Sequence, residues 1–309
     1  MKKYYLGIDG GGTKTAFMLA DEKGSIVSEY TGPTCHYLQC GYEGVTKTIS
    51  DGLGSIISTA GISKDDIVNT FIGCAGFGDT ALDDPLIKEA AGKALSGIPF
   101  TIGNDCENAL AGALDGKDGI NIIAGTGSMA YGINSKKNLS MRCGGWHHLI
   151  GSDEGSGFWI AWNILKEFSR QSDGRDEKTP LYDLIKKELQ IGDDDGEILA
   201  RVIGEWGFDR TRVASISPLI SVLYDKGDPH AIRIINEAAS ELADLAKALY
   251  RKLDFSEEGA AVSGTGGVFK LGSRITDPLS SILFKNGMTF TPALHSPVYG
   301  SVILAMKGC

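Results

Sequence analysis

Glycine and threonine recur together at three places in the chain, a combination suited to binding phosphate. The three segments are Asp9-Gly10-Gly11-Gly12-Thr13-Lys14-Thr15, Ala124-Gly125-Thr126-Gly127-Ser128 and Ser263-Gly264-Thr265-Gly266-Gly267. A turn without β-carbons lets backbone N–H groups point at an anion, and threonine or serine hydroxyls add donors. We therefore expect the first two segments to bind the phosphates of a nucleotide. The third segment is predicted to be a strand end that enters a helix, and it is expected to let a flat adenine ring lie against bare backbone.

The first segment begins with a carboxylate, Asp9. This carboxylate could hold the magnesium ion that accompanies a nucleotide. The first segment lacks the GxxxxGK[ST] spacing of a P-loop. It is also followed by a predicted strand, whereas a dinucleotide-binding GxGxxG turn opens a helix. A simple hairpin turn is the alternative for the first segment alone, and three such segments together favour nucleotide binding.

The elements that surround the first two segments repeat. An apolar strand, a Gly/Thr turn, a strand, a charged turn and a third strand follow one another twice in the same order. The strands are expected at residues 4–9, 15–20 and 25–31, and again at 120–124, 129–133 and 139–143. This repetition indicates two domains of common ancestry, each opening with a Gly/Thr turn.

The remaining pattern predicts an α/β protein of two lobes. Strands are expected at residues 68–74, 100–102 and 260–263, and helices at 45–59 and 86–95, from Asn104-Asp105 onward, at 232–253 and from Ser296 onward. The apolar seam of 232–253 is expected to be core rather than a dimer surface. We place the smaller lobe at residues 1–115 and the larger at 116–309, with the option that helix 296–309 docks back on the first lobe.

Composition excludes several classes of partner. The 309 residues carry a net charge of -9 and show no basic stripe, so nucleic acid and anionic membranes are poor partners. The N-terminus does not resemble a secretory signal, and no window is apolar enough for a transmembrane helix. The six cysteines match no zinc or CxxC spacing. We therefore expect a cytoplasmic protein, with its cysteines reduced and mostly buried.

The three glycine segments, in this order and spacing, resemble the phosphate and adenosine motifs of the actin-like ATPase superfamily. The segment Cys143-Gly144-Gly145-Trp146-His147-His148-Leu149-Ile150-Gly151-Ser152-Asp153-Glu154-Gly155-Ser156 is similar to the GGWG…GDEGS signature of the N-acetylglucosamine kinase branch of the BadF/BadG/BcrA/BcrD ATPase family. The resemblance runs essentially end to end. It implies a duplicated ribonuclease H-like fold, with a mixed sheet in each lobe and a nucleotide cleft between the lobes.

The resemblance also implies roles for single residues. Asp105 matches the catalytic aspartate, which accepts the proton of a sugar hydroxyl as the phosphoryl group is transferred. Asp9 would hold magnesium, through water, and the three glycine segments would bind ATP. The implied sugar-binding residues are His36, Asn104, Asp105, Gly145, Trp146 and Asp153. A helix N-cap is the alternative role for Asp105, and a simple core position is the alternative for Trp146.

The implied activity is transfer of the γ-phosphate of MgATP to the 6-hydroxyl of an amino sugar, with N-acetylglucosamine as the first choice. Departures from the family pattern lie in the sugar site. Cys35 replaces the asparagine of the family's Thr-Asn-His-Trp segment, Ser152 is an extra residue before Asp153, and Cys106-Glu107 stands where small residues are usual. Glucosamine, N-acetylmuramic acid and glucose therefore stay open as substrates.

Other functions are less well supported. An ATPase that activates a 2-hydroxyacyl-CoA dehydratase or aryl-CoA reductase would need cluster-ligating cysteines in a context that this chain lacks. A decayed sugar sensor conflicts with the intact Asp9 and Asp105, and a kinase of the repressor/open-reading-frame group would need a zinc-binding cysteine cluster. We expect His36, His147 and His148 to be polar lining or surface residues and not a metal site. The oligomeric state stays open, with a homodimer as one option.

Overall fold

The computed structural model describes residues 2–308 of the chain. The described backbone divides into two compact units. Unit 1 is made of Met1–Gly119 together with Pro292–Cys309, and unit 2 is Ile120–Thr291. The chain is an α/β protein with two mixed five-stranded sheets, and their strands are numbered in chain order.

The sheet of unit 1 has the strand order β3-β2-β1-β4-β5. Its strands are β1 (Tyr4–Gly10), β2 (Lys14–Asp21), β3 (Ile26–Pro33), β4 (Ile67–Cys74) and β5 (Phe100–Gly103). Strands β1, β2 and β3 pair antiparallel, whereas β4 runs parallel to β1 and β5 parallel to β4. The carboxyl ends of β1, β4 and β5 therefore meet at one edge, which is where open α/β sheets bind ligands.

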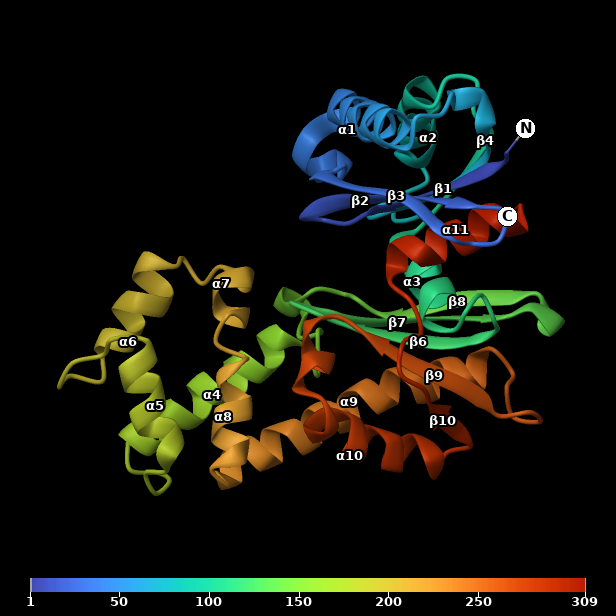
Figure 1. Cartoon of the computed structure of the whole chain (residues 1–309). Coiled ribbons are helices and arrows are strands. Elements are labelled where there is room, and N and C mark those ends of the chain that lie inside the picture. Colours follow the sequence, from blue (N-terminus) through green and yellow to red (C-terminus); the bar gives the residue numbers. More distant parts are fainter. Residues whose placement is uncertain (1, 309) are drawn as a thin grey trace. The chain divides into compact units, whose positions relative to one another are not determined.

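Helices cover both faces of this first sheet (Figure 1). They are α1 (Tyr37–Ala60), α2 (Asp84–Ala94), α3 (Asp105–Ala113) and α11 (Pro297–Lys307), with a short 3₁₀ turn η1 (Lys64–Asp66). Helix α1 packs on β2 and β3, while α11 packs on β1 and β4 and against α3. A Cβ on Gly7 would lie 2.6 Å from the carbonyl oxygen of Val298, so α11 approaches the sheet backbone closely. The C-terminal helix thus belongs to the core of unit 1.

The sheet of unit 2 has the strand order β10-β9-β6-β7-β8. Its strands are β6 (Gly119–Ala124), β7 (Ser128–Asn134), β8 (Leu139–Gly144), β9 (Ala260–Thr265) and β10 (Met288–Phe290). Strands β6, β9 and β10 run parallel. Read from β8, the order repeats that of the first sheet strand by strand, which confirms the predicted duplication.

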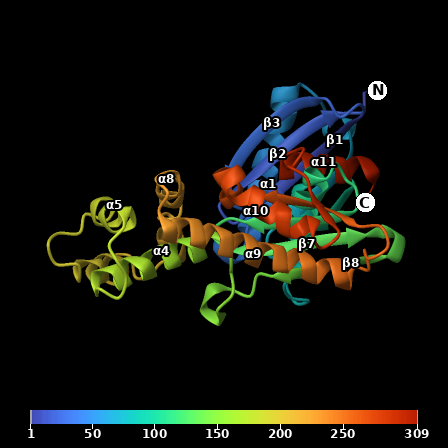
Figure 2. The same ribbon diagram turned by 90° about the horizontal axis from the view of Figure 1, so that it is seen from below.

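The rest of unit 2 is helical. The elements are η2 (Ser135–Lys137), η3 (His148–Ile150), α4 (Gly157–Ser172), α5 (Pro180–Glu188), α6 (Glu197–Leu199), the π-helical turn η4 (Ala200–Glu205), α7 (Arg210–Ala214), α8 (Leu219–Asp225), α9 (Pro229–Lys252), η5 (Gly267–Leu271) and α10 (Ser273–Phe284). Helix α9 packs on β7 and β8, and α10 packs on α9 and β10 (Figure 2). Leu242, Ala246 and Leu249 of α9 are fully buried, so the predicted seam is core.

Two sequence-based boundaries were wrong. The first helix begins at Tyr37, well before the expected residue 45, and is kinked at Gly41, whose φ is 69°. This glycine and its polar neighbours interrupt the apolar period that marks a helix. The third glycine segment enters a 3₁₀ turn first and reaches helix α10 only after Gly272. Among residues 2–308, no helix combines the length and the apolar character needed to span a membrane.

Candidate active site

The first glycine segment forms the tight connection between β1 and β2. The N–H of Gly11 donates to the carbonyl of Lys14 at 3.1 Å. Two side chains, one just before α1 and one in its first turn, also hold the turn. Thr34 donates to the carbonyl of Gly11 and Gln39 to that of Gly12, both at 2.8 Å. The turn and residues 34–39 are therefore one locally fixed structure.

Close packing explains the first glycine of this turn. A Cβ on Gly10 would overlap the Sγ of Cys35, which is fully buried. Cys35 occupies the place of the family's asparagine, so in this chain it packs under the turn. Thr15, also predicted to bind nucleotide, is fully buried in β2. Lys14 and Thr13 are exposed at the turn.

Asp9 lies near the end of β1, beside the same turn. Asn108 of α3 donates to its Oδ1 at 2.8 Å. Burial raises the pKa of Asp9, while the hydrogen bond from Asn108 and the charge of Lys14 oppose this rise. A desolvated carboxylate with little compensating charge is a suitable group to hold a cation.

Asp105 is the first residue of α3, directly after β5. The N-cap of this helix is Asn104, whose side chain accepts from the N–H of Cys106 at 3.0 Å, and Glu107 completes a capping box. The alternative that Asp105 itself caps the helix is therefore wrong. Burial, and then the charge of Asp9, raise the pKa of Asp105 to about 6. Such a carboxyl group is largely ionised at neutral pH and is basic enough to accept a proton.

Two predicted sugar residues of unit 1, His36 and Asn104, contact the loop after β4, and Asn104 directly precedes Asp105. His36 is the N-cap of α1, and its ring stacks on Tyr37 with centroids 5.7 Å apart. Asn104 donates to the carbonyl of Phe77 at 2.6 Å while its oxygen caps α3. A Cβ on Gly76 would lie 2.9 Å from the Tyr37 ring. The amide of Asn104 is thus already engaged within the protein, and its contact with sugar stays a prediction.

The second glycine segment connects β6 and β7 in unit 2. The N–H of Gly125 donates to the carbonyl of Gly127 at 2.9 Å. The first two N–H groups of α4, on Gly157 and Phe158, donate to the carbonyls of Gly125 and Thr126 at 2.8 and 3.1 Å. The N-terminus of α4 therefore fixes the second turn by donating hydrogen bonds to the carbonyl groups of that turn.

Asp153 lies against this second turn and is 1% exposed. Its Oδ1 accepts from the N–H of Ser128 at 3.2 Å, and its Oδ2 accepts from Nη2 of Arg210 at 2.6 Å. The family resemblance assigns Asp153 to sugar binding. In the structure its carboxylate accepts hydrogen bonds from the second glycine turn and from an arginine. Sequence reasoning missed Arg210, because it lies in a five-residue helix with no motif around it.

The third glycine segment touches the second. Strands β6 and β9 are parallel, with Ile123 opposite Thr265, so both segments follow strand ends at the same edge. Gly266 has a φ of 104°, and a Cβ there would overlap the carbonyl of Ala124. The ring of Phe269 packs directly on Gly264, and a Cβ there would overlap this ring. Within unit 2, the predicted phosphate turn and the predicted adenosine segment therefore form one surface.

A pocket of about 270 Å³ adjoins this surface. Its lining combines apolar groups with hydroxyls and two cations, and the residues are Ile160, Ser217, Pro218, Ser221, Gly267, Val268, Lys270, Leu271 and Arg274. The hydroxyl of Ser217 lies 3.2 Å from where a Cβ on Gly157 would stand, so the pocket reaches the start of α4 beside the second turn. A flat, mostly apolar ring with a few polar edges fits such a lining. Sequence reasoning found Gly267 but missed the contribution of the segment before α8.

Trp146 lies in the loop before η3, and this loop and η3 both carry exposed apolar side chains. Trp146 is 71% exposed, and Leu149 and Ile150 are exposed to a similar degree. The alternative that Trp146 is a core residue is therefore wrong. The rings of His147 and His148 lie 4.2 Å apart, and burial, followed by the charge of His147, lowers the pKa of His148. Gly145 precedes Trp146 with a φ of 75°.

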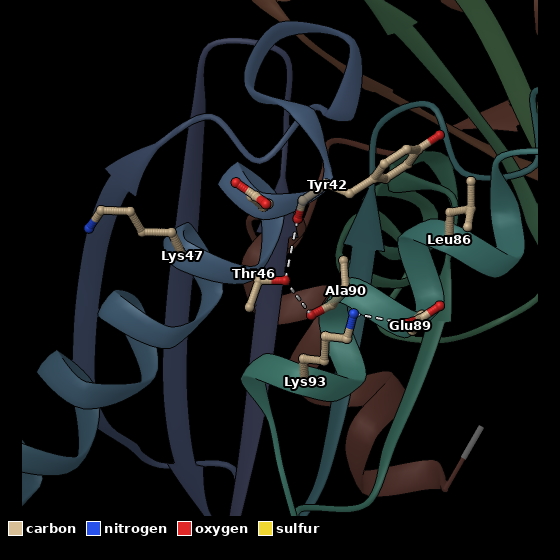
Figure 3. A pocket seen from close by; sticks show the side chains of 8 residues that line it. Tyr42, Thr46, Lys47, Leu86, Glu89, Ala90 and Lys93 are labelled. Atoms are coloured by element: carbon tan, nitrogen blue, oxygen red, sulfur yellow. Dashed lines mark hydrogen bonds and ion pairs between the residues drawn. The ribbon is translucent and has the colours of Figure 1, made fainter.

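A cavity of about 450 Å³ between α1 and α2 includes none of the predicted site residues (Figure 3). Several of its polar groups already have partners within the protein. Thr46 donates to the carbonyl of Ala90 at 3.0 Å, and Lys93 pairs with Glu89 at 2.8 Å.

The duplicated sheet, with a glycine turn after the first strand of each copy, defines the actin-like ATPase fold. The chain belongs to the BadF/BadG/BcrA/BcrD ATPase family, whose model matches residues 6–305. The chain is 31% identical to the N-acetylmuramic acid/N-acetylglucosamine kinase of Clostridium acetobutylicum, over 99% of both chains. It is 30% identical to the N-acetyl-D-glucosamine kinase of Dictyostelium discoideum, over 99% of this chain and 98% of that one.

A solved structure of similar fold comes from Chromobacterium violaceum and is described as a putative N-acetylglucosamine kinase. It has 23% sequence identity and a TM-score of 0.72, covering 98% of this chain and 99% of that one. At this identity the likeness supports the fold.

Proposed function

We propose that this protein is an ATP-dependent amino-sugar kinase that transfers the γ-phosphate of MgATP to the 6-hydroxyl of N-acetylglucosamine or a close relative. The two relatives that match it over nearly their whole length are kinases of N-acetylated amino sugars. The observation that carries the proposal is Asp105, a carboxyl group with a pKa of about 6 at the strand edge that also bears Asp9 and the first glycine turn.

Asp105 acts as the general base in this proposal. It accepts the proton of the attacking hydroxyl, which is too weak a nucleophile in its neutral form. Gly12 and Thr13 are exposed in the fixed turn after β1, and in this proposal their backbone N–H groups bind the phosphates. Unit 2 contributes the second turn and the pocket beside Ser217 for adenine.

Magnesium fits the donors of unit 1. Asp9 supplies carboxylate oxygen, the ligand type that this ion prefers. Burial is the main cause that raises the pKa of Asp9 and of Asp105, and the charge of Asp9 raises that of Asp105 further, so a bound cation would stabilise both carboxylates. The ion, once bound with the nucleotide, neutralises charge on the phosphates, and Asp9 is the residue that would hold it, through water.

A coupled assay of ADP release tests this function directly. The purified protein is given MgATP and, separately, N-acetylglucosamine, N-acetylmuramic acid, glucosamine or glucose, with mass spectrometry of the sugar product. We expect ADP formation that depends on an amino sugar and a product phosphorylated at position 6. ATP hydrolysis that no sugar stimulates would refute the kinase assignment and favour an ATPase that drives another protein.

A further inference from the structure

The carboxylate of Asp153 is a negative group at a turn that is proposed to bind negatively charged phosphate. It lies within hydrogen-bond distance of the second glycine turn, which is proposed to bind phosphate, and it is buried. Its backbone φ of 70° is uncommon for a residue other than glycine, so the fold accepts strain to place it there. A buried anion beside a phosphate site would repel the ligand unless a cation balances it.

Arg210 supplies that cation and lies on the turn itself. Its Nη2 donates to Oδ2 of Asp153 at 2.6 Å, and its side chain is 30% exposed. A Cβ on Gly127 would overlap Nη2 of Arg210 and lie 2.6 Å from Oδ1 of Asp153. The second glycine of the turn is therefore required by the arginine–aspartate pair.

The guanidinium group also keeps unused donor capacity. The Nε–H of Arg210 is buried and has no hydrogen-bond partner among the described residues. An arginine has five N–H donors, and the hydrogen bond to Asp153 uses one of those of Arg210. Planar guanidinium groups bind phosphate through two donors at once, so a phosphate oxygen is a suitable partner for the remainder.

We infer that Arg210 binds the nucleotide phosphates at the second glycine turn, and that Asp153 acts as the positioning residue for its guanidinium group. This inference rests on the proposed nucleotide-binding function. It gives Asp153 a task that differs from the sugar contact implied by the family resemblance. The ligand is a nucleoside polyphosphate, and the contribution of Arg210 grows with the number of phosphates.

Equilibrium binding by calorimetry separates a phosphate contact from a structural one. The titrants are AMP, MgADP and the non-hydrolysable analogue MgAMPPNP. We expect Arg210→Ala to weaken MgAMPPNP binding about tenfold or more, as expected for loss of a charge-assisted hydrogen bond, and to leave AMP binding within about twofold. Arg210→Lys should recover part of the loss. Arg212→Ala is the matched control, because this arginine lies on the same helix and its exposed side chain donates to the carbonyl of Glu205.

A double variant covers the risk that Arg210→Ala leaves Asp153 unbalanced and the unit unstable. Asp153→Asn/Arg210→Gln removes both charges and keeps two side chains that can bond to each other. We expect it to unfold at the wild-type temperature and still to bind MgAMPPNP about tenfold more weakly. Wild-type affinity in this double variant would show that Arg210 only neutralises Asp153, and would overturn the inference. Absence of sugar-dependent ADP formation in the wild type would instead refute the kinase proposal, and the binding series would still be readable.

Discussion

The side chains of Asp9 and Asp105 are both desolvated, yet they differ in their surroundings. Asp9 accepts a hydrogen bond from Asn108 and feels the charge of Lys14. Asn104, and not Asp105, caps helix α3. Burial, and then the charge of Asp9, raise the pKa of Asp105 to about 6. Burial raises the pKa of both carboxyl groups. In the proposed function Asp9 holds the cation and Asp105 accepts the proton of the sugar hydroxyl.

Replacement of Asp105 tests its role as the base. We expect Asp105→Asn to lower sugar-dependent ADP formation by about 10²–10⁴-fold, because the amide cannot accept the proton. The helix keeps its Asn104 cap, so the circular dichroism spectrum should be unchanged. Asp183→Asn, an exposed carboxylate in the first turn of α5, is the matched control and should retain the wild-type rate. Near-normal turnover of Asp105→Asn would contradict the assignment.

The same residue sets a pH dependence. The ionised base is the active form, so kcat/KM of the wild type should rise as pH increases through about 6 and then level off. The folded-state pKa lies above the ordinary 3.8, so ionisation of Asp105 destabilises the folded chain. This penalty is absent below pH 3.8 and complete above about 6. Asp105→Asn should therefore raise the free energy of unfolding at pH 8 by up to about 3 kcal/mol, with no gain below pH 4, as measured by urea titration.

At the scale of elements, the two turns that follow β1 and β6 are each fixed by a helix, but in different ways. The side chains of Thr34, just before α1, and of Gln39, in α1, donate to the first turn, whereas backbone N–H groups of α4 donate to the second. The glycine patterns predicted both turns, because bare backbone is a local property of sequence. The pair between Asp153 and Arg210 could not be predicted in this way, since 57 residues separate its members and no period links them.

The second turn offers two glycines for comparison. A Cβ on Gly127 would collide with Arg210 and Asp153, whereas a Cβ on Gly125 would meet open space. We expect Gly127→Ala to lower the free energy of unfolding by about 1–3 kcal/mol, as for an overpacked site. Gly125→Ala should change it by less than about 0.5 kcal/mol. Chemical denaturation of the two variants measures both values, and equal losses would show that the pair does not occupy this space.

At the scale of the whole molecule, the strand order could be predicted in outline from the repeated pattern of strand, turn and strand. The two sheets share that order, and the chain closes unit 1 with its C-terminal helix. The lining of the adenine-sized pocket could not be predicted, because Ser217 and Pro218 carry no motif. Only the fold brings them beside Gly267.

The contact of α11 with α3 depends on facing glycines. A Cβ on Gly300 would overlap the carbonyl of Asn108 and the N–H of Gly112. We expect Gly300→Ala to destabilise the protein by at least about 1–3 kcal/mol, because two helix backbones must move apart. Gly54→Ala, at an exposed position of α1 with open space around it, should instead stabilise by about 0.5–1 kcal/mol. A neutral Gly300→Ala would show that α11 is not tightly packed in unit 1.

Unit 1 is discontinuous in sequence, since unit 2 lies between α3 and α11. During synthesis, the strands of the first sheet emerge long before the helix that covers one of their faces. Buried side chains on that face, such as Met18 and Ala20, which pack against Val302, would stay open to water while the whole of unit 2 is made. Exposed apolar strands of this kind are prone to aggregation. Unit 2 can therefore finish folding first on the ribosome, and a message cut short before α11 would yield a product that chaperones and proteases recognise.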